Sequence, residues 1–169
     1  MDDYLHHESN REHSKFLTFY LNDQPYGVNV TNILQIIAIP EITPIPQTPV
    51  FIKGVINRSG RITPVMDLRL RLNLPVRDYD DRTSIIVIKA HIKDGSVTMG
   101  IIVDNVVEVM DIGGENVDEL PPMGSEIDNN YIAGMAKIKG KVITLLDTER
   151  ILSREMLNKL KDIQQKSTS

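Results

Sequence analysis

Short stretches of the chain alternate apolar and polar residues with a period of two. Residues 16–21, FLTFYL, place three apolar side chains on one side of an extended segment and polar ones on the other. This is the pattern of a β-strand with one buried face. Further apolar stretches that predict strands cover 26–30, 33–39, 51–57, 61–66, 84–92, 97–103, 106–112 and 131–147, the last of which contains a hairpin.

Turn-forming residues separate these stretches. Lys93-Asp94-Gly95-Ser96 is a hairpin signal, and Gly60 lies where the turn after Arg58 requires a positive φ. Residues 40–49 contain four prolines, so this segment cannot join a strand ladder and is predicted to be an exposed loop. Residues 76–83 are polar and charged, and they are predicted to connect two parts of the chain.

The sequence repeats itself. IKGVINRSGRITPVMDLRLRL at 52–72 is echoed by IAGMAKIKGKVITLLDTERIL at 132–152, an interval of eighty residues (132 minus 52). YGVNVTNI at 26–33 is echoed by MGIIVDNV at 99–106, an interval of 73 (99 minus 26). Two segments that recur in the same order indicate one structural unit used twice. The matched residues assigned to turns and caps are Gly54, Gly60, Asp67, Gly134, Gly140 and Asp147.

The repeat predicts two halves, at about 16–75 and 84–147, within one domain that spans 16–152. Each half has about five short strands, which would most economically close into a small barrel. Residues 1–15 are predicted to be a flexible N-terminal segment. Residues 148–165 are predicted to form a C-terminal helix, because apolar residues recur there at helical spacing: Leu152, Met156, Leu160 and Ile163.

Composition indicates a globular protein, with 41% apolar and 25% charged residues among 169. The chain has no cysteine, which excludes disulfides and favours a reducing compartment such as the cytosol. No stretch approaches the roughly 18 apolar residues that cross a bilayer, so no direct membrane insertion is expected. A net charge of −4 with both signs interspersed gives no footprint for nucleic acid.

Signatures of catalysis are sparse. Asp67 and Asp147 could be read as paired catalytic carboxylates, but each precedes a short helical turn, and helix capping is the better interpretation. His91 lies in a predicted strand without a nucleophile nearby in sequence, and is interpreted as a surface residue. We therefore predict no catalytic residues, no metal site and no cofactor.

Two matched segments carry more apolar residues than one face of a short strand can bury. These segments are 30–39 and 103–110. The surplus could form a core shared between the halves, or it could stay exposed as a protein-binding groove. The sequence leaves these alternatives evenly balanced, and both can hold if the two sides of each segment differ.

Several motifs resemble the CheW family of bacterial chemotaxis adaptors. The resemblance covers about 16–152 and is carried by YGV at 26–28, ITPIP at 42–46, FIKGVIN at 51–57 and GRITPVMDLR at 60–69. It implies an all-β fold of two small five-stranded SH3-like barrels packed together, followed by the C-terminal α-helix. It also implies a non-enzymatic cytoplasmic adaptor recruited to membrane-associated receptor arrays. Its partners would be the C-terminal regulatory domain of the histidine kinase CheA and the cytoplasmic tips of methyl-accepting chemoreceptors.

The chain departs from the family at one pair of positions. The family reads Asn-Leu-Arg-Gly where this chain has NRSG at 57–60, so the arginine is displaced to Arg58, and a glutamate common in the family is replaced by Gln35. A shift of one residue in a strand changes the face on which a side chain lies. The polar contact that this pair supports elsewhere in the family is therefore not assigned to Ser59.

Candidate docking residues follow from the apolar surplus and from the resemblance. For receptor binding the candidates are Val30, Ile33, Ile37, Val103, Val106 and Met110; for kinase binding they are the apolar residues of the two dissimilar loops, Ile42, Ile45, Met123 and Ile127. The alternative function is a double barrel that binds a small molecule or a nucleic acid. That function would require a basic stripe or an aromatic stacking platform, and the sequence shows neither.

Overall fold

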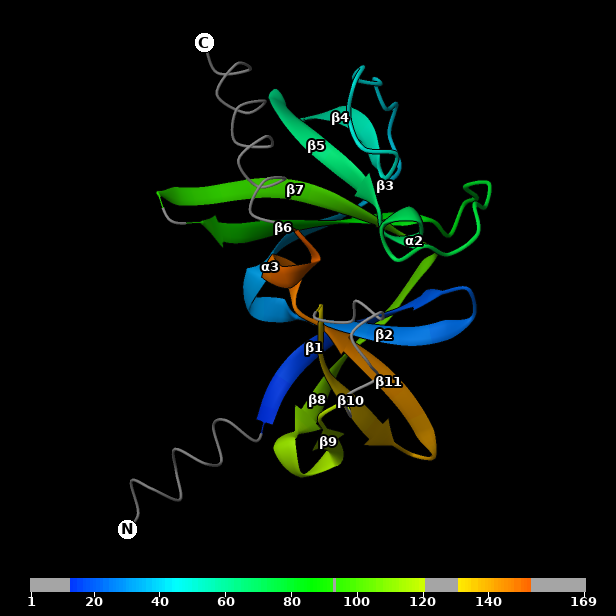
Figure 1. Ribbon diagram of the computed structural model, residues 1–169, viewed down its shortest axis with the longest axis vertical. Helices are drawn as coiled ribbons and strands as arrows, with labels where there is room; N and C mark the ends of the chain where they lie inside the picture. Colours follow the sequence, from blue (N-terminus) through cyan, green and yellow to red (C-terminus); the bar gives the residue numbers. More distant parts are fainter. Residues whose placement is uncertain (1–12, 93, 121–130, 153–169) are drawn as a thin grey trace.

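The computed structural model describes residues 13–92, 94–120 and 131–152, which form two twisted sheets (Figure 1). Sheet 1 contains, in spatial order, β8 (Asn105–Gly113), β1 (His13–Leu21), β2 (Gln24–Asn29), β11 (Lys141–Leu146), β10 (Ile132–Ile138) and β9 (Val117–Asp118). Sheet 2 contains β3 (Ile33–Ala38), β6 (Ser84–Ile92), β7 (Gly95–Val103), β5 (Arg61–Asp67) and β4 (Ile52–Arg58). The predicted all-β architecture with two SH3-like barrels is confirmed. Sheet 1 has a sixth strand because of the two-residue β9.

The two barrels do not correspond to two contiguous halves of the sequence. Strands β1 and β2 from the first half pair with β8 and β11 from the second, antiparallel and parallel respectively. In the same way β6 and β7 pair with β3 and β5. Each half therefore donates its first two strands to the sheet that contains the last strands of the other half. The expectation that each half closes its own barrel was wrong, because a repeat in sequence does not determine which copy a strand pairs with.

Three apolar cores follow from this exchange. One core fills the barrel of sheet 2 around Val65 and Ile102, and another fills the barrel of sheet 1 around Ile112 and Leu145. The third and largest lies between the sheets, with Phe19 contributed by β1 and Met99 by β7. We call this third cluster the central core. It holds the two barrels together, and it accounts for much of the apolar surplus seen in the sequence.

The repeated glycines of β2 and β7 lie where neighbouring strands approach closely. A Cβ atom added to Gly100 would lie 2.6 Å from Cγ2 of Ile85 and 2.9 Å from Cγ1 of Val65. At the equivalent Gly27 the nearest atom would be Cδ2 of Leu145, at 3.1 Å. Side chains of the partner strands therefore occupy the space above both glycines, more tightly at Gly100.

The caps and turns fall where the repeat places them. Asp67 accepts a hydrogen bond from the N–H of Arg69 and caps α2 (Leu68–Arg71), and Asp147 caps α3 (Thr148–Ile151) in the same way. Gly60 and Gly140 have φ of +86° and +78° in the β4–β5 and β10–β11 turns. The other matched glycines, at 54 and 134, lie at register shifts inside β4 and β10 and not in turns.

The remaining expectations about segments have mixed outcomes. Residues 114–118, directly after β8, form η2 (Gly114–Asn116) and β9, and β9 pairs with β10. A further 3-10 turn, η1 (Val30–Asn32), joins β2 to β3. Of the predicted C-terminal helix, residues 148–151 form α3, which ends at the buried Leu152, whose backbone is extended (φ −97°, ψ 128°), and residues 153–165 lie outside the described part of the chain. None of the helices that the structure describes has the length and apolar content needed to cross a membrane.

Candidate docking surfaces

The residues predicted to line a receptor groove mostly face inward. Val103 is completely buried in the central core, so placing it on a surface was wrong. Ile33 and Val106 are partly buried and pack against the same core, as does Val30. Ile37 packs against the core of barrel 2, which is the barrel of sheet 2. Met110 packs against the core of barrel 1, which is the barrel of sheet 1. Of the two alternatives for these residues, a shared core and an exposed groove, the structure places them in the core.

The opposite faces of the same strands are apolar and exposed. Leu34 and Ile36 on β3 are 52% and 45% exposed, and Val107 and Val109 on β8 are 47% and 54% exposed. The two pairs are equivalent in the repeat, since each is separated by 73 residues (107 minus 34, 109 minus 36). Both strands lie at an edge of their sheet. We call these four side chains the edge-strand face. The sequence predicted where the two strands lie but not which of their faces is exposed, because a shift of one residue exchanges inner and outer positions.

The proline-rich loop is attached to barrel 2 by its own backbone. Thr43 exchanges two backbone hydrogen bonds of 2.9 Å with Val55, and Ile42 packs against the barrel core. Ile45 is half-buried, and Val50, directly after this segment, is an apolar side chain that is 77% exposed. Val50 was not among the predicted residues. The other two kinase-binding candidates, Met123 and Ile127, lie outside the described residues.

The displaced arginine and its expected partner meet despite the change in sequence. The guanidinium of Arg58 donates to Oε1 of Gln35 at 3.4 Å and to Oγ1 of Thr63 at 3.4 Å. Both hydrogen bonds are long, and the acceptors are neutral. Arg58 and Gln35 therefore form only a weak polar contact between β4 and β3 in this chain.

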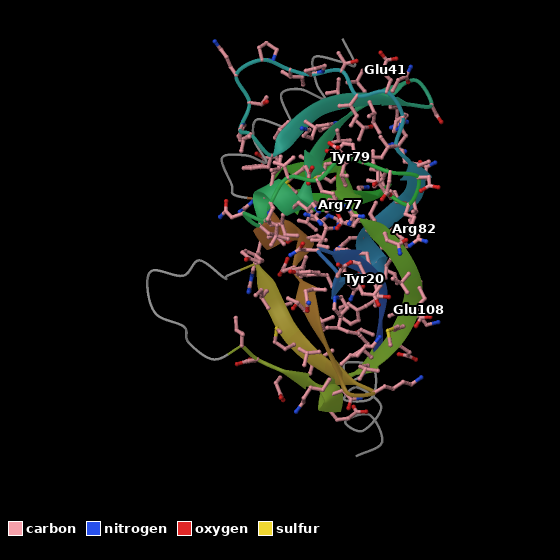
Figure 2. All side chains as sticks on the ribbon, turned by 90° about the vertical axis from the view of Figure 1, so that its right-hand side faces the viewer. Tyr20, Glu41, Arg77, Tyr79, Arg82 and Glu108 are labelled. Carbon is pink, nitrogen blue, oxygen red and sulfur yellow. The ribbon has the colours of Figure 1, made fainter. Side chains whose placement is uncertain are left out.

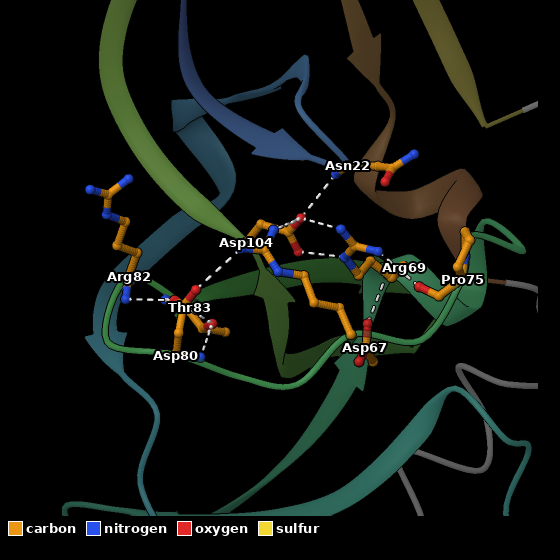
Figure 3. A network of polar contacts seen from close by, with 9 residues as sticks. Asn22, Asp67, Arg69, Pro75, Asp80, Arg82, Thr83 and Asp104 are labelled. Atoms are coloured by element: carbon orange, nitrogen blue, oxygen red, sulfur yellow. Dashed lines mark hydrogen bonds and ion pairs between the residues drawn. The ribbon is translucent and has the colours of Figure 1, made fainter.

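A polar network joins the two sheets (Figure 3). Asp104 lies between β7 and β8, and its carboxylate accepts two hydrogen bonds of 2.7 Å from Arg69 of α2. It also accepts one from the backbone N–H of Asn22 at 2.9 Å and one from Arg77 at 3.2 Å. Arg69 donates in addition to the carbonyl of Pro75 at 2.8 Å. We call these residues the Asp104 network; they tie sheet 1, sheet 2 and the connecting segment at one point.

The charges in this network shift the titration of its members. Burial by itself would raise the pKa of Asp104, but hydrogen bonds from Arg69 and Asn22, with the positive charges of Arg69 and Arg77, outweigh burial and lower it. The hydrogen bond to Asp104 raises the pKa of Arg69. Nearby, burial and a 2.8 Å hydrogen bond from its hydroxyl to Asp67 raise the pKa of Tyr79. The sequence offered no signal for the pairing of Arg69 with Asp104, since 35 residues separate them.

Candidate chemistry for a cofactor is sparse in the described part of the chain. No three His, Asp or Glu side chains there come together as a metal-ligand set. His91 is exposed on β6, as the sequence indicated. The exposed apolar faces and the Asp104 network are thus the features from which a function can be argued.

Comparison with known proteins identifies the family. The family model of the CheW-like domain matches residues 15–156 of this sequence. The chemotaxis protein CheW of Klebsiella aerogenes is 32% identical over 141 residues, which are 83% of this chain and 82% of the relative. CheW of Thermotoga maritima is 33% identical over 136 residues, 80% of this chain and 85% of the relative. The crystal structure of the scaffolding protein TtCheW from Thermoanaerobacter tengcongensis has a TM-score of 0.73 and 31% identity, and the match covers 82% of this chain and 92% of that one. The chain therefore belongs to the CheW-like family.

Proposed function

We propose that this protein is a non-enzymatic adaptor of bacterial chemotaxis, which couples transmembrane chemoreceptors to the histidine kinase CheA in cytoplasmic arrays at the membrane. Its relatives bear the names of chemotaxis proteins and of a scaffolding protein. The observation that carries the proposal is the edge-strand face, four half-exposed apolar side chains on two equivalent strands. Exposed apolar residues gathered on a small β domain are suited to binding another protein.

The receptor is proposed to dock on the edge-strand face. Strands β3 and β8 both begin at the central core, where Ile33 and Val106 pack, and their outer sides carry Leu34 and Val107. An amphipathic helix could lay an apolar stripe against such a surface. Burying the remaining exposed half of each aliphatic side chain would contribute about 1 kcal/mol.

The kinase is proposed to dock on a different surface, the proline-rich loop. Val50, directly after the loop, is 77% exposed, and the hydrogen bonds between Thr43 and Val55 hold the loop against barrel 2. A loop that is already fixed loses less conformational entropy when a partner binds. Met123 and Ile127 remain candidates for the same contact.

Two charge substitutions separate the proposed surfaces. Leu34→Glu should weaken binding to a receptor cytoplasmic fragment and leave binding to the CheA regulatory domain unchanged, as measured by titration calorimetry. Val50→Glu should have the opposite effect. Because both side chains are at least half exposed, neither substitution should lower the melting temperature appreciably.

The adjacent Ile33→Glu is the matched control for Leu34→Glu, because it places the same charge one residue away and against the central core. We expect it to destabilise the fold. A wild-type protein that binds neither partner would overturn the proposed function. Binding of both partners that survives Leu34→Glu and Val50→Glu would overturn the two surfaces.

A further inference from the structure

A polar hollow of about 330 Å³ opens beside the Asp104 network. Figure 2 shows Tyr20, Arg77 and Arg82 on this side of the molecule, at the level where the two sheets meet. The hollow is lined by Tyr20, Asp23, Arg77, Arg82, Asp104 and Asn105. The docking surfaces proposed above do not include this hollow, and the names of the relatives give it no role.

The segment that carries the two arginines is fixed by its own turn. Oδ1 of Asp80 accepts hydrogen bonds from the N–H groups of Arg82 and Thr83, at 2.8 and 3.1 Å. The backbone N–H of Asp80 donates in return to Oγ1 of Thr83 at 2.9 Å. The backbone of Arg82 is therefore held in place. Its exposed guanidinium has no hydrogen bond or ion pair to any other residue that the structure describes.

The second arginine is available because its acceptor is already satisfied. Asp104 receives both of its shortest side-chain hydrogen bonds from Arg69, whose side chain is only 6% exposed. Arg77 adds longer contacts of 3.2 Å to Asp104 and to Asp80, from a side chain that is 46% exposed, and Asp80 also keeps the hydrogen bonds of its own turn. Arg77 can thus turn toward an incoming anion while Asp104 keeps a complete bidentate partner.

The connecting segment also exposes residues of kinds that are common at protein interfaces. Val76 is 78% exposed and Tyr79 is 37% exposed, and both belong to the same connecting segment as the arginines. Arg and Tyr are among the residues that carry most binding energy at interfaces.

We propose that this hollow binds a carboxylate side chain of an acidic segment on a partner protein, with Arg82 and Arg77 as the donors. Asp23 at the rim opposes a second negative charge, so the site suits a single carboxylate. The inference rests on the proposed function only in assigning the acidic segment to a protein of the chemotaxis array. The preference for a carboxylate itself follows from the residues that line the hollow.

The first test uses a synthetic hexaglutamate peptide, titrated into the whole isotope-labelled protein and followed by NMR at low salt, where screening is weak. The amide signals of residues 77–83 and 104–105 should shift in a saturable manner. Arg82→Glu should weaken this binding about fivefold or more, the upper range for one exposed ion pair. Asp23→Asn should strengthen it, and the matched control Lys89→Glu, an exposed change on β6, should leave it unchanged. Shifts that map elsewhere, or equal effects of the Arg82 and Lys89 substitutions, would overturn the site.

The second test identifies the source of the acid. The CheA regulatory domain and a receptor cytoplasmic fragment are each titrated with the wild-type protein and the same three variants. Arg82→Glu should weaken binding to one of them at least about fivefold, and Asp23→Asn should strengthen that same interaction. If the wild-type protein binds both partners and no variant changes either affinity, the inference fails while the proposed function stands. If the wild-type protein binds neither while hexaglutamate still binds, the proposed function and the assignment to the array fail together, and the carboxylate site remains.

Discussion

Removing the carboxylate of Asp104 should destabilise the protein more than any single surface substitution. Asp104→Ala leaves the guanidinium of Arg69 without its partner, and that side chain is only 6% exposed. Breaking one member of a buried ion pair typically costs about 3 to 5 kcal/mol. We expect the lower end, about 3 kcal/mol, because Arg69 keeps its hydrogen bond to the carbonyl of Pro75.

Loss of the Asp104 charge should also change how stability depends on pH. The folded protein lowers the pKa of Asp104 below its ordinary value near 3.9. The carboxylate therefore contributes stability that is complete above about pH 4 and is lost as the pH falls through the lower, folded-state pKa. Asp104→Asn should remove this acid-sensitive part of the stability, so its loss of stability below about pH 4 should be shallower than that of the wild-type protein.

Urea unfolding at neutral pH and at several acidic pH values measures both effects. Arg77→Ala is the control, because Arg77 contacts the same carboxylate from a side chain that is 46% exposed and should contribute less than about 1 kcal/mol. A double-mutant cycle of Arg69→Met with Asp104→Ala then isolates the pairwise coupling. The reasoning is refuted if Asp104→Ala costs no more than Arg77→Ala.

Two further predictions test the packing and the strand exchange. Gly100→Ala should destabilise by about 1 to 3 kcal/mol in thermal or urea unfolding, because its Cβ would lie 2.6 Å from Cγ2 of Ile85, while Gly27→Ala should cost less; the reverse order would contradict this account of the two glycines. Separately expressed fragments 1–75 and 76–169 should each fail to fold as native monomers by circular dichroism and should regain the native spectrum when mixed, whereas a native barrel from either fragment alone would disprove the exchange.

The sequence specified the elements of this fold better than their partners. Alternation located the strands, and the intervals of 73 and 80 residues related Gly27 to Gly100 and Asp67 to Asp147. The sequence did not predict which strands pair. Strand β1 fits the edge offered by β8, and its counterpart β6 fits the edge offered by β3. Equivalent strands present equivalent edges, so the sequence does not distinguish pairing within a half from exchange between halves.

The candidate sites were likewise predicted only in part. The surplus of apolar residues pointed to β3 and β8, but the inner Ile33 and the outer Leu34 are both aliphatic, so no contrast in polarity marked the buried side. The Asp104 network was not predicted, because its members come from distant segments and their proximity depends on how β7 leads into β8. Arg58 and Gln35 could be suspected as a pair only from the resemblance to the family.

Co-sedimentation with receptor-bearing membranes tests the proposed coupling most directly. Membranes that contain chemoreceptors are mixed with the CheA regulatory domain, with and without this protein, and pelleted. We predict that the regulatory domain enters the pellet only when this protein is present, and that Leu34→Glu and Val50→Glu each reduce its recovery, the first by weakening receptor binding and the second by weakening kinase binding. A regulatory domain that pellets equally well without this protein, or that stays in the supernatant when it is present, would contradict the proposed function.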